Sequence, residues 1–101
     1  MTNNNQSKFY REAYKKFFDN WGFDAQSMIC IEEMSELTKA LCKYRRYDKE
    51  NAPEEIKQNL LEEIADVLNV TEAMKQYLNE DQIEEIRKQK VVRTLKRLED
   101  K

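Results

Sequence analysis

The sequence predicts an all-α fold in which four helices form a bundle that packs into a homo-oligomer. The 101 residues include one Gly and one Pro, which is too little turn material for a many-stranded sandwich or barrel. Apolar residues recur three and four positions apart along most of the chain, which is the period of amphipathic helices. A single domain of this length buries only about 60–65% of its unfolded surface. Self-association is therefore expected.

The first half of the chain contains signals for two helices. A polar segment over residues 1–6 is expected to be disordered, and a single helical domain is expected over residues 7–101. Aromatic residues spaced four apart predict a first helix over residues 7–20. Gly22 is expected to end this helix, and a second helix follows over residues 24–46.

The second half contains signals for two more helices. Residues 47–52 form a polar link, and Pro53 followed by Glu54 predicts the start of a third helix that reaches residue 78. Asn79 with Gln82 three residues later is typical of a capping box. The fourth helix is therefore expected to begin at Asn79 and to end near residue 98.

Composition excludes several classes of enzyme. The chain has no His, which removes Ser-His-Asp triads, HExxH zinc sites and Glu-x-x-His di-iron sites. Glycine-rich phosphate loops are also absent. With 20 acidic and 18 basic residues and a net charge of −2, the chain is not expected to bind nucleic acid specifically. Carboxylates must carry any catalysis.

The two cysteines favour a cytoplasmic protein. Cys30 and Cys42 are 12 residues apart, which on one helix separates them by about 18 Å and prevents an intrachain disulfide. Reduced thiols are typical of the cytosol. The polar N-terminus does not resemble a signal peptide, and no apolar run is long enough to cross a bilayer.

The second predicted helix places one acid inside its apolar stripe. At about 100° per residue, Glu33 falls within the stripe and Glu36 on its rim, whereas Glu32 points away. The stripe itself consists of Ile29, Cys30, Met34, Leu37, Ala40, Leu41 and Tyr44.

The third predicted helix repeats this arrangement. Glu63 falls inside the apolar stripe, Asp66 lies on its rim about 60° away, and Glu62 points outward. The stripe consists of Ile56, Leu60, Ile64, Val67, Val70, Met74 and Leu78.

Two helices that each aim an acid into their packing face predict a metal site. An unpartnered buried carboxylate costs several kcal/mol, and neighbouring carboxylates also repel one another. A hard divalent cation removes both penalties, and an all-oxygen ligand set suits Mg²⁺ or Mn²⁺. The alternative is that Glu33 and Glu63 pair with Lys90, Arg93 or other cations across the bundle.

The same residues resemble a known family. Glu32-Glu33-Met34-Ser35-Glu36 followed by Glu63-Ile64-Ala65-Asp66 is similar to the E-E-x-x-E … E-x-x-D signature of MazG-like all-α nucleoside triphosphate pyrophosphohydrolases. The resemblance covers roughly residues 20–98. It implies that Glu33, Glu36, Glu63 and Asp66 are the metal ligands, and that Mg²⁺-dependent cleavage between the α- and β-phosphates yields a nucleoside monophosphate and pyrophosphate. It also implies a homodimer or homotetramer.

One departure affects base recognition. Some members of this superfamily place a histidine near the nucleotide, and this chain has none. The base must therefore be recognised by other groups.

Further roles can be assigned from residue chemistry. The candidate catalytic residues are Glu32, Glu33 and Glu36, and either Glu32 or Glu36 is a candidate to take the proton of the attacking water. Phosphates require cations, and the candidates are Lys43, Lys90, Arg93 and Arg97. A solvated basic face is the alternative for the last predicted helix.

The candidates for base binding are Trp21, Asn69 and Tyr77. Trp21 lies in the turn that leads to the acidic helix and could stack on a base. Its alternative role is that of a packing anchor. Asn69 is off the acidic face in helical phase.

A different class of function competes with the enzyme. The chain could be a non-catalytic oligomerisation or regulatory module whose basic C-terminal helix contacts a partner. A metal-dependent rise in thermal stability would favour the enzyme over the module.

Overall fold

The computed structural model describes residues 4–48 and 50–100, which fold into three helices. They are α1 (Asn4–Arg45), α2 (Glu54–Leu78) and α3 (Glu80–Glu99). The described residues contain no strand, so the all-α prediction is confirmed. The expected count of four helices is not confirmed, because α1 spans both of the first two predicted helices, which meet at a kink with a non-helical residue, Gly22. The first residue of α1, Asn4, lies inside the segment that was expected to be disordered, and residues 1–3 lie outside the described range.

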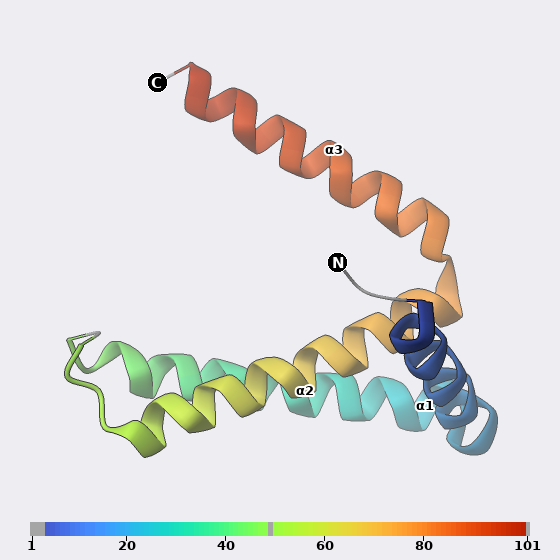
Figure 1. The fold of residues 1–101 in the computed structure, drawn as a ribbon, viewed down its shortest axis with the longest axis horizontal. Coiled ribbons are helices and arrows are strands. Elements are labelled where there is room, and N and C mark those ends of the chain that lie inside the picture. Colours follow the sequence, from blue (N-terminus) through green and yellow to red (C-terminus); the bar gives the residue numbers. More distant parts are fainter. Residues whose placement is uncertain (1–3, 49, 101) are drawn as a thin grey trace.

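Gly22 bends α1 at the predicted break. Its φ of 83° and ψ of 171° are non-helical, in a region that is essentially restricted to glycine. Figure 1 shows the result: the first segment of α1, drawn in dark blue, runs across the direction of the second segment. The glycine therefore interrupts the helical backbone at the predicted position, and two helical segments meet there at a corner.

The second segment of α1 and the whole of α2 form an antiparallel helix hairpin (Figure 1). On each helix, the residues that face the partner helix alternate three and four positions apart, as in a coiled coil. We call these rows the seam. All of its residues are buried or half-buried: Gln26, Cys30, Glu33, Leu37, Ala40 and Tyr44 on α1, and Ile56, Leu60, Glu63, Val67, Val70 and Met74 on α2.

The predicted apolar stripes were too wide. Five of their members are exposed in the structure, namely Ile29, Met34, Leu41, Ile64 and Leu78. The reason is geometric: one partner helix covers only a narrow seam, whereas a stripe with three or four apolar residues in each two turns needs neighbours on two sides.

The first segment of α1 packs across the C-terminal half of α2. Tyr14 and Phe18 are buried against Ala73, with Met74 beside them. The hydroxyl of Tyr14 donates a hydrogen bond to Asn69 Oδ1 at 2.9 Å, and the ring of Phe18 stacks on Tyr77 with centroids 4.3 Å apart. This small cluster holds the first segment of α1 against α2.

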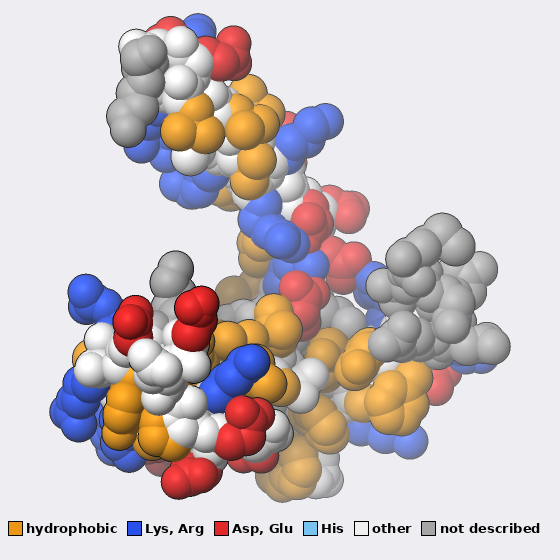
Figure 2. All heavy atoms as spheres, turned by 60° about the vertical axis from the view of Figure 1, so that its left-hand side comes forward, with side chains coloured by type: hydrophobic (Ala, Val, Ile, Leu, Met, Phe, Trp, Pro, Cys, Tyr) orange, Lys and Arg blue, Asp and Glu red, His pale blue; other side chains and the backbone are white. Residues whose placement is uncertain are grey.

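Helix α3 leaves the end of α2 and projects away from the hairpin (Figures 1 and 2). Asn79 caps it as predicted, because its Oδ1 accepts a hydrogen bond from the backbone N–H of Gln82 at 3.1 Å. Two ion pairs fix its first turns: Arg11 with Glu80 at 2.7 Å, and Lys75 with Glu84 at 2.5 Å. No residue of α3 is buried.

The chain is extended for its length. Its radius of gyration is 16.7 Å, against about 13 Å for a compact domain of this size. The described helices of one chain therefore do not form a closed bundle, and the packing into a homo-oligomer stays a prediction. None of the described helices has the length and apolarity needed to cross a membrane.

We predict that Gly22→Ala lowers the free energy of unfolding by about 1–3 kcal/mol. A Cβ at this position meets no atom within 4 Å, so backbone strain alone carries the effect. Denaturant titration followed by circular dichroism measures it, with Asn20→Ala, at an exposed helical position, as the control. An unchanged midpoint for Gly22→Ala would show that the corner does not need glycine.

Candidate metal centre

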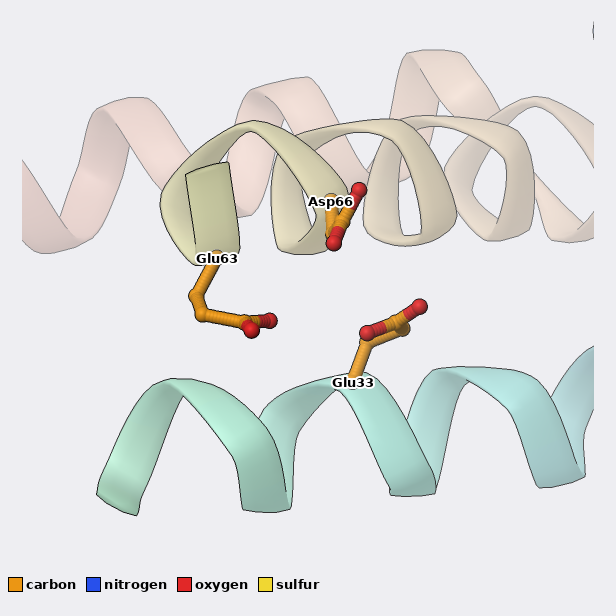
Figure 3. A group of neighbouring side chains, drawn as sticks. All are labelled: Glu33, Glu63 and Asp66. Carbon is orange, nitrogen blue, oxygen red and sulfur yellow. The ribbon is translucent and has the colours of Figure 1, made fainter. Parts of the chain in front are cut away.

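Three carboxylates meet across the seam between α1 and α2. One oxygen from each of Glu33, Glu63 and Asp66 can be chosen so that all three lie within 4.8 Å of one another. Figure 3 shows Glu63 and Asp66 projecting from α2 toward Glu33 on α1. The predicted convergence of acids from two helices is therefore present.

The seam explains why these acids converge. Glu33 and Glu63 occupy positions in the seam, where the partner helix half-buries them. Asp66 is one turn beyond Glu63 and is exposed at the flank of α2. Residues three apart on a helix lie on neighbouring faces, so Asp66 can reach the same point in space as Glu63.

The cluster has no cationic partner among the residues that the structure describes. Within the part of the chain that the structure describes, no ion pair involves Glu33, Glu63 or Asp66. Glu63 Oε1 is buried and has no hydrogen-bond partner. The alternative in which lysines or arginines neutralise these acids within one chain is therefore not what the structure shows.

The electrostatics of the cluster are unfavourable for negative charge. The pKa of Glu33 is raised above its ordinary value, first by burial and then by the charges of Asp66, Glu63, Glu36 and Glu32. Both causes disfavour the ionised carboxylate. A bound cation would offset the repulsion between the neighbouring carboxylates, and the carboxylates would then remain ionised.

The fourth predicted ligand, Glu36, stands apart from the other three. Its side chain is half exposed, and Lys39 Nζ approaches its Oε2 at 3.4 Å. It nevertheless lies one turn from Glu33 on α1 and adds to the rise in the pKa of Glu33. Glu32 is exposed on the outer side of α1.

The donor set fits a hard divalent cation. The three carboxylates present only oxygen, which is the ligand that Mg²⁺ and Mn²⁺ prefer. The unpartnered Oε1 of Glu63 is the kind of buried acceptor that a cation satisfies. Glu33, Glu63 and Asp66 would hold such an ion, with Glu36 as the nearest additional carboxylate on α1.

The predicted phosphate-binding cations are not gathered around the carboxylates. Lys43 is exposed on α1, and Lys90, Arg93 and Arg97 are exposed on α3. Within the described residues, no hydrogen bond or ion pair joins α3 beyond Glu84 to another helix.

The three predicted base-binding residues lie in different surroundings. Asn69 accepts the hydrogen bond from Tyr14, and Tyr77 stacks between Phe18 and Phe23. Trp21 is exposed and lies against Phe17 with ring centroids 5.8 Å apart. Trp21 also lines a shallow hollow together with Lys16, Asp19 and Asn20.

A cavity that the sequence did not reveal begins at Asn69. It has a volume of about 460 Å³ and lies between the first segment of α1 and the outer side of α2. Its wall includes Tyr10, Tyr14, Asn69, Lys75 and Gln76. The only sequence signal for it was the spacing of four between Tyr10 and Tyr14, and the crossing of the two helices could not be inferred from that.

We predict that Glu33→Gln stabilises the metal-free protein at pH 7 and raises its melting temperature by several degrees, because one repelling charge is lost. In the wild type, the raised pKa means that, at pH values between the ordinary glutamate pKa and the raised one, the folded state keeps a proton that the unfolded chain has lost. The free energy of unfolding therefore falls as the pH rises from the ordinary glutamate pKa through the raised value. The variant should lack that fall.

Thermal melts in EDTA from pH 4 to 8 test this, with the outward-facing Glu62→Gln as the control. A destabilised Glu33→Gln protein would contradict the repulsion described above.

The chain was compared with family models, curated proteins and solved structures. No family model, curated protein or solved structure matches the chain. What the site can do follows from three carboxylates on two facing helices, one of which carries a buried oxygen without a partner.

Proposed function

We propose that this protein is a Mg²⁺-dependent nucleotide pyrophosphohydrolase, which cleaves the α–β phosphate bond of an NTP or dNTP to give an NMP and pyrophosphate. The observation that carries the proposal is the carboxylate cluster in the seam, with the buried, unpartnered Oε1 of Glu63 and no cation paired to it within residues 4–48 and 50–100. Such a cluster is costly to keep unless it binds a cation.

A divalent cation held by these acids would allow the site to act on phosphate groups. When bound, Mg²⁺ or Mn²⁺ neutralises the charge of phosphate oxygens and lowers the pKa of an attacking water. The protein's own contribution is to fix the carboxylates on two rigid, packed helices. Glu33, Glu63 and Asp66 would hold the ion, with Glu36, now beside Lys39, as the nearest additional carboxylate on α1.

The proton of the attacking water needs an acceptor near the cluster. Glu36 and Glu32 are the candidates. Glu36 is on the same flank of the hairpin as Asp66, about 60° from Glu33 in helical projection, whereas Glu32 is on the outer side of α1. We therefore infer that Glu36 is the better placed of the two.

The resemblance to MazG-like pyrophosphohydrolases supports the same function. The signature residues Glu33, Glu36, Glu63 and Asp66 are the acids that lie in or beside the cluster. The all-α fold agrees with membership of that superfamily, and the free thiols of Cys30 and Cys42 agree with a cytoplasmic enzyme.

The triphosphate also needs positive charge, which one chain supplies poorly. Lys43 is on the hairpin, but Lys90, Arg93 and Arg97 are on the projecting helix α3. We propose that these three residues act on the carboxylate cluster of a neighbouring copy in a homodimer or homotetramer.

The cavity beside Asn69 offers room for a base. Its volume of about 460 Å³ is within the range of small-molecule sites. Asn69 is one turn beyond Asp66 on α2, and Tyr14 orients its side-chain amide. Tyr77 and Trp21 are the further candidates, through stacking.

We predict that Mg²⁺ or Mn²⁺ raises the melting temperature of the wild type, because a ligand that binds only the folded state stabilises it by about 2.7 kcal/mol at a hundred times its Kd. Glu63→Gln should abolish the response, and Glu62→Gln should keep it. Differential scanning fluorimetry with EDTA, MgCl₂ and MnCl₂ measures the shifts.

The competing function, a non-catalytic interaction module, would give a different result. The exposed, basic α3 is the feature that such a module would use. Its acids would have no need of metal, so the melting temperature would not respond to either ion.

We predict that the wild type releases pyrophosphate from at least one member of a panel of NTPs and dNTPs in the presence of Mg²⁺. Glu33→Gln and Glu63→Gln should abolish turnover, because each removes a charged ligand. A coupled pyrophosphate assay measures the rates, with Glu62→Gln as the matched control. Silence across the panel from a folded protein, or variants within about tenfold of the wild-type rate, would refute the catalytic proposal.

A further inference from the structure

A single residue joins α2 to α3. Asn79 lies between the two helices with an extended backbone, φ −171° and ψ 89°, which any residue can adopt. Hinges in proteins often occur at such element ends, because a few residues there absorb the change in dihedral angles. The covalent joint alone therefore does not determine the direction of α3.

Packing does not determine that direction either. Only Glu80 and Ile83 of α3 are half-buried, and every other residue of the helix is exposed. Figure 1 shows the helix pointing away from the hairpin directly after the joint. Within the described residues, no hydrogen bond or ion pair joins α3 beyond Glu84 to another helix. Contacts of the first turns must therefore decide where the rest of α3 points.

Two ion pairs connect these first turns to two different helices. Glu80 pairs with Arg11 on α1 at 2.7 Å, and Glu84 pairs with Lys75 on α2 at 2.5 Å. The side chain of Lys75 is only 16% exposed and also pairs with Glu72 at 2.8 Å, so α2 itself holds its ammonium group in place. We call the pairs Arg11–Glu80 and Lys75–Glu84 together the latch.

The two cations of the latch are fixed relative to each other. The backbone carbonyl of Arg11 accepts a hydrogen bond from Gln76 Nε2 at 2.9 Å, which connects this part of α1 to α2 beside Lys75. The next turns of α1 pack on α2 through the aromatic cluster described above. With the joint at Asn79, the latch gives α3 three points of attachment. Three points favour one direction, whereas the joint alone does not.

The charges of the latch are matched. The pKa of Glu80 is lowered, first by the hydrogen bond from Arg11, and the pKa of Glu84 is lowered, first by the hydrogen bond from Lys75. Both acids are therefore ionised at neutral pH. An exposed ion pair shifts an equilibrium by about fivefold at most. Such a pair adds little to the stability of a fold, but it is enough to favour one direction of a hinged helix.

The length of α3 amplifies small movements at the latch. Arg97 lies 18 residues beyond Asn79, which is about 27 Å along a helix. A change of about 20° in the direction of α3 would displace Arg97 by about 9 Å. Hydrogen bonds join atoms that are only about 3 Å apart, so a displacement of this size separates the guanidinium from a phosphate that it would bind.

We propose that the latch directs α3 so that its cations reach the carboxylate cluster of a neighbouring copy, which makes Arg11 and Lys75 positioning residues of that site. The inference rests on the proposed function for the role of these cations, but not for the direction of α3. With the latch closed, Lys90, Arg93 and Arg97 are in place for the triphosphate. With the latch open, the apparent affinity for substrate falls in proportion to the closed fraction, while turnover at saturation is unchanged.

The first part of the test measures the direction of α3 without nucleotide or metal. One spin label is attached to Cys42, which is exposed on α1, whereas Cys30 is buried. A second label is attached to a cysteine introduced by Val92→Cys, at an exposed position of α3. Double electron–electron resonance in an excess of unlabelled protein then gives the distance within one chain. Glu84→Lys should broaden the distance distribution or shift it by several ångströms, because two ammonium groups then repel each other at Lys75.

Matched controls separate the latch from charge in general. Glu85→Lys makes the same change of charge one residue further on, where the hydrogen bond of the acid, from Gln89, stays within α3. It should leave the distribution unchanged. On α1, Arg11→Glu should broaden the distribution and Arg11→Lys should keep it narrow. Lys15→Glu, which breaks the pair with Asp19 inside α1, should have no effect.

The second part of the test measures turnover and depends on the proposed function. With a nucleotide that the wild type cleaves in Mg²⁺, Glu84→Lys should raise KM by about fivefold or more at an unchanged kcat. A residue needed only for folding would not separate KM from kcat in this way. Arg93→Gln removes a cation rather than moving it, so it should lower kcat as well.

The two parts fail separately. A wild type that cleaves no nucleotide would contradict the proposed function, and the distances alone would then decide whether the latch directs α3. Unchanged distances in Glu84→Lys and Arg11→Glu, or equal broadening by Glu85→Lys, would overturn the inference, and so would an active Glu84→Lys enzyme with the wild-type KM. Circular dichroism must show wild-type helix content in every variant. If a charge reversal does not fold, Glu84→Gln and Arg11→Gln replace it, with the same expected direction of change.

Discussion

The main constraint on the structure is the presence of two glutamates in the contact between α1 and α2. Glu33 and Glu63 occupy positions that a helix hairpin normally fills with apolar side chains, and Asp66 adds a third charge beside them. Without a cation, this contact loses apolar burial, desolvates carboxylates and brings like charges together. The rest of the hairpin must therefore hold the helices in place firmly enough to keep the acids facing each other. The packing of apolar residues on both sides of the acids, from Cys30 to Ala40 and from Leu60 to Val67, does this.

Much of this arrangement could be predicted from the sequence, because it depends on helical phase alone. Counting 100° per residue was enough to place Glu33 and Glu63 in the packing face and Glu62 outside it. The corner at Gly22 and the cap at Asn79 are also local features, which depend on one backbone conformation and on one side chain that bonds its own backbone. Such features do not require knowledge of what lies across the fold.

The remaining features depend on contacts between segments that are distant in the sequence. Ile29, Met34 and Ile64 belong to apolar stripes, but whether they are buried depends on which neighbour lies on each side of the hairpin. The direction of α3 depends on the pairing of Glu80 with Arg11, 69 residues away. Glu36 lies beside Lys39 on its own helix, and its separation from Glu63 and Asp66 on the partner helix could not be inferred from the sequence. The helical phase of a residue predicts on which side of its helix the residue lies. It does not predict which other segment covers that side.

The exposure of α3 has a consequence for the cooperativity of the fold. A helix of 20 residues that buries none of its side chains has few tertiary contacts to keep its backbone hydrogen bonds closed, and most of the stability of helices in proteins comes from tertiary packing. Its amide protons would exchange with solvent through local fraying, whereas those of the hairpin would exchange only in larger openings. The single chain thus has two levels of local stability, and the boundary between them lies at the two ion pairs, Arg11–Glu80 and Lys75–Glu84, that anchor the first turns of α3.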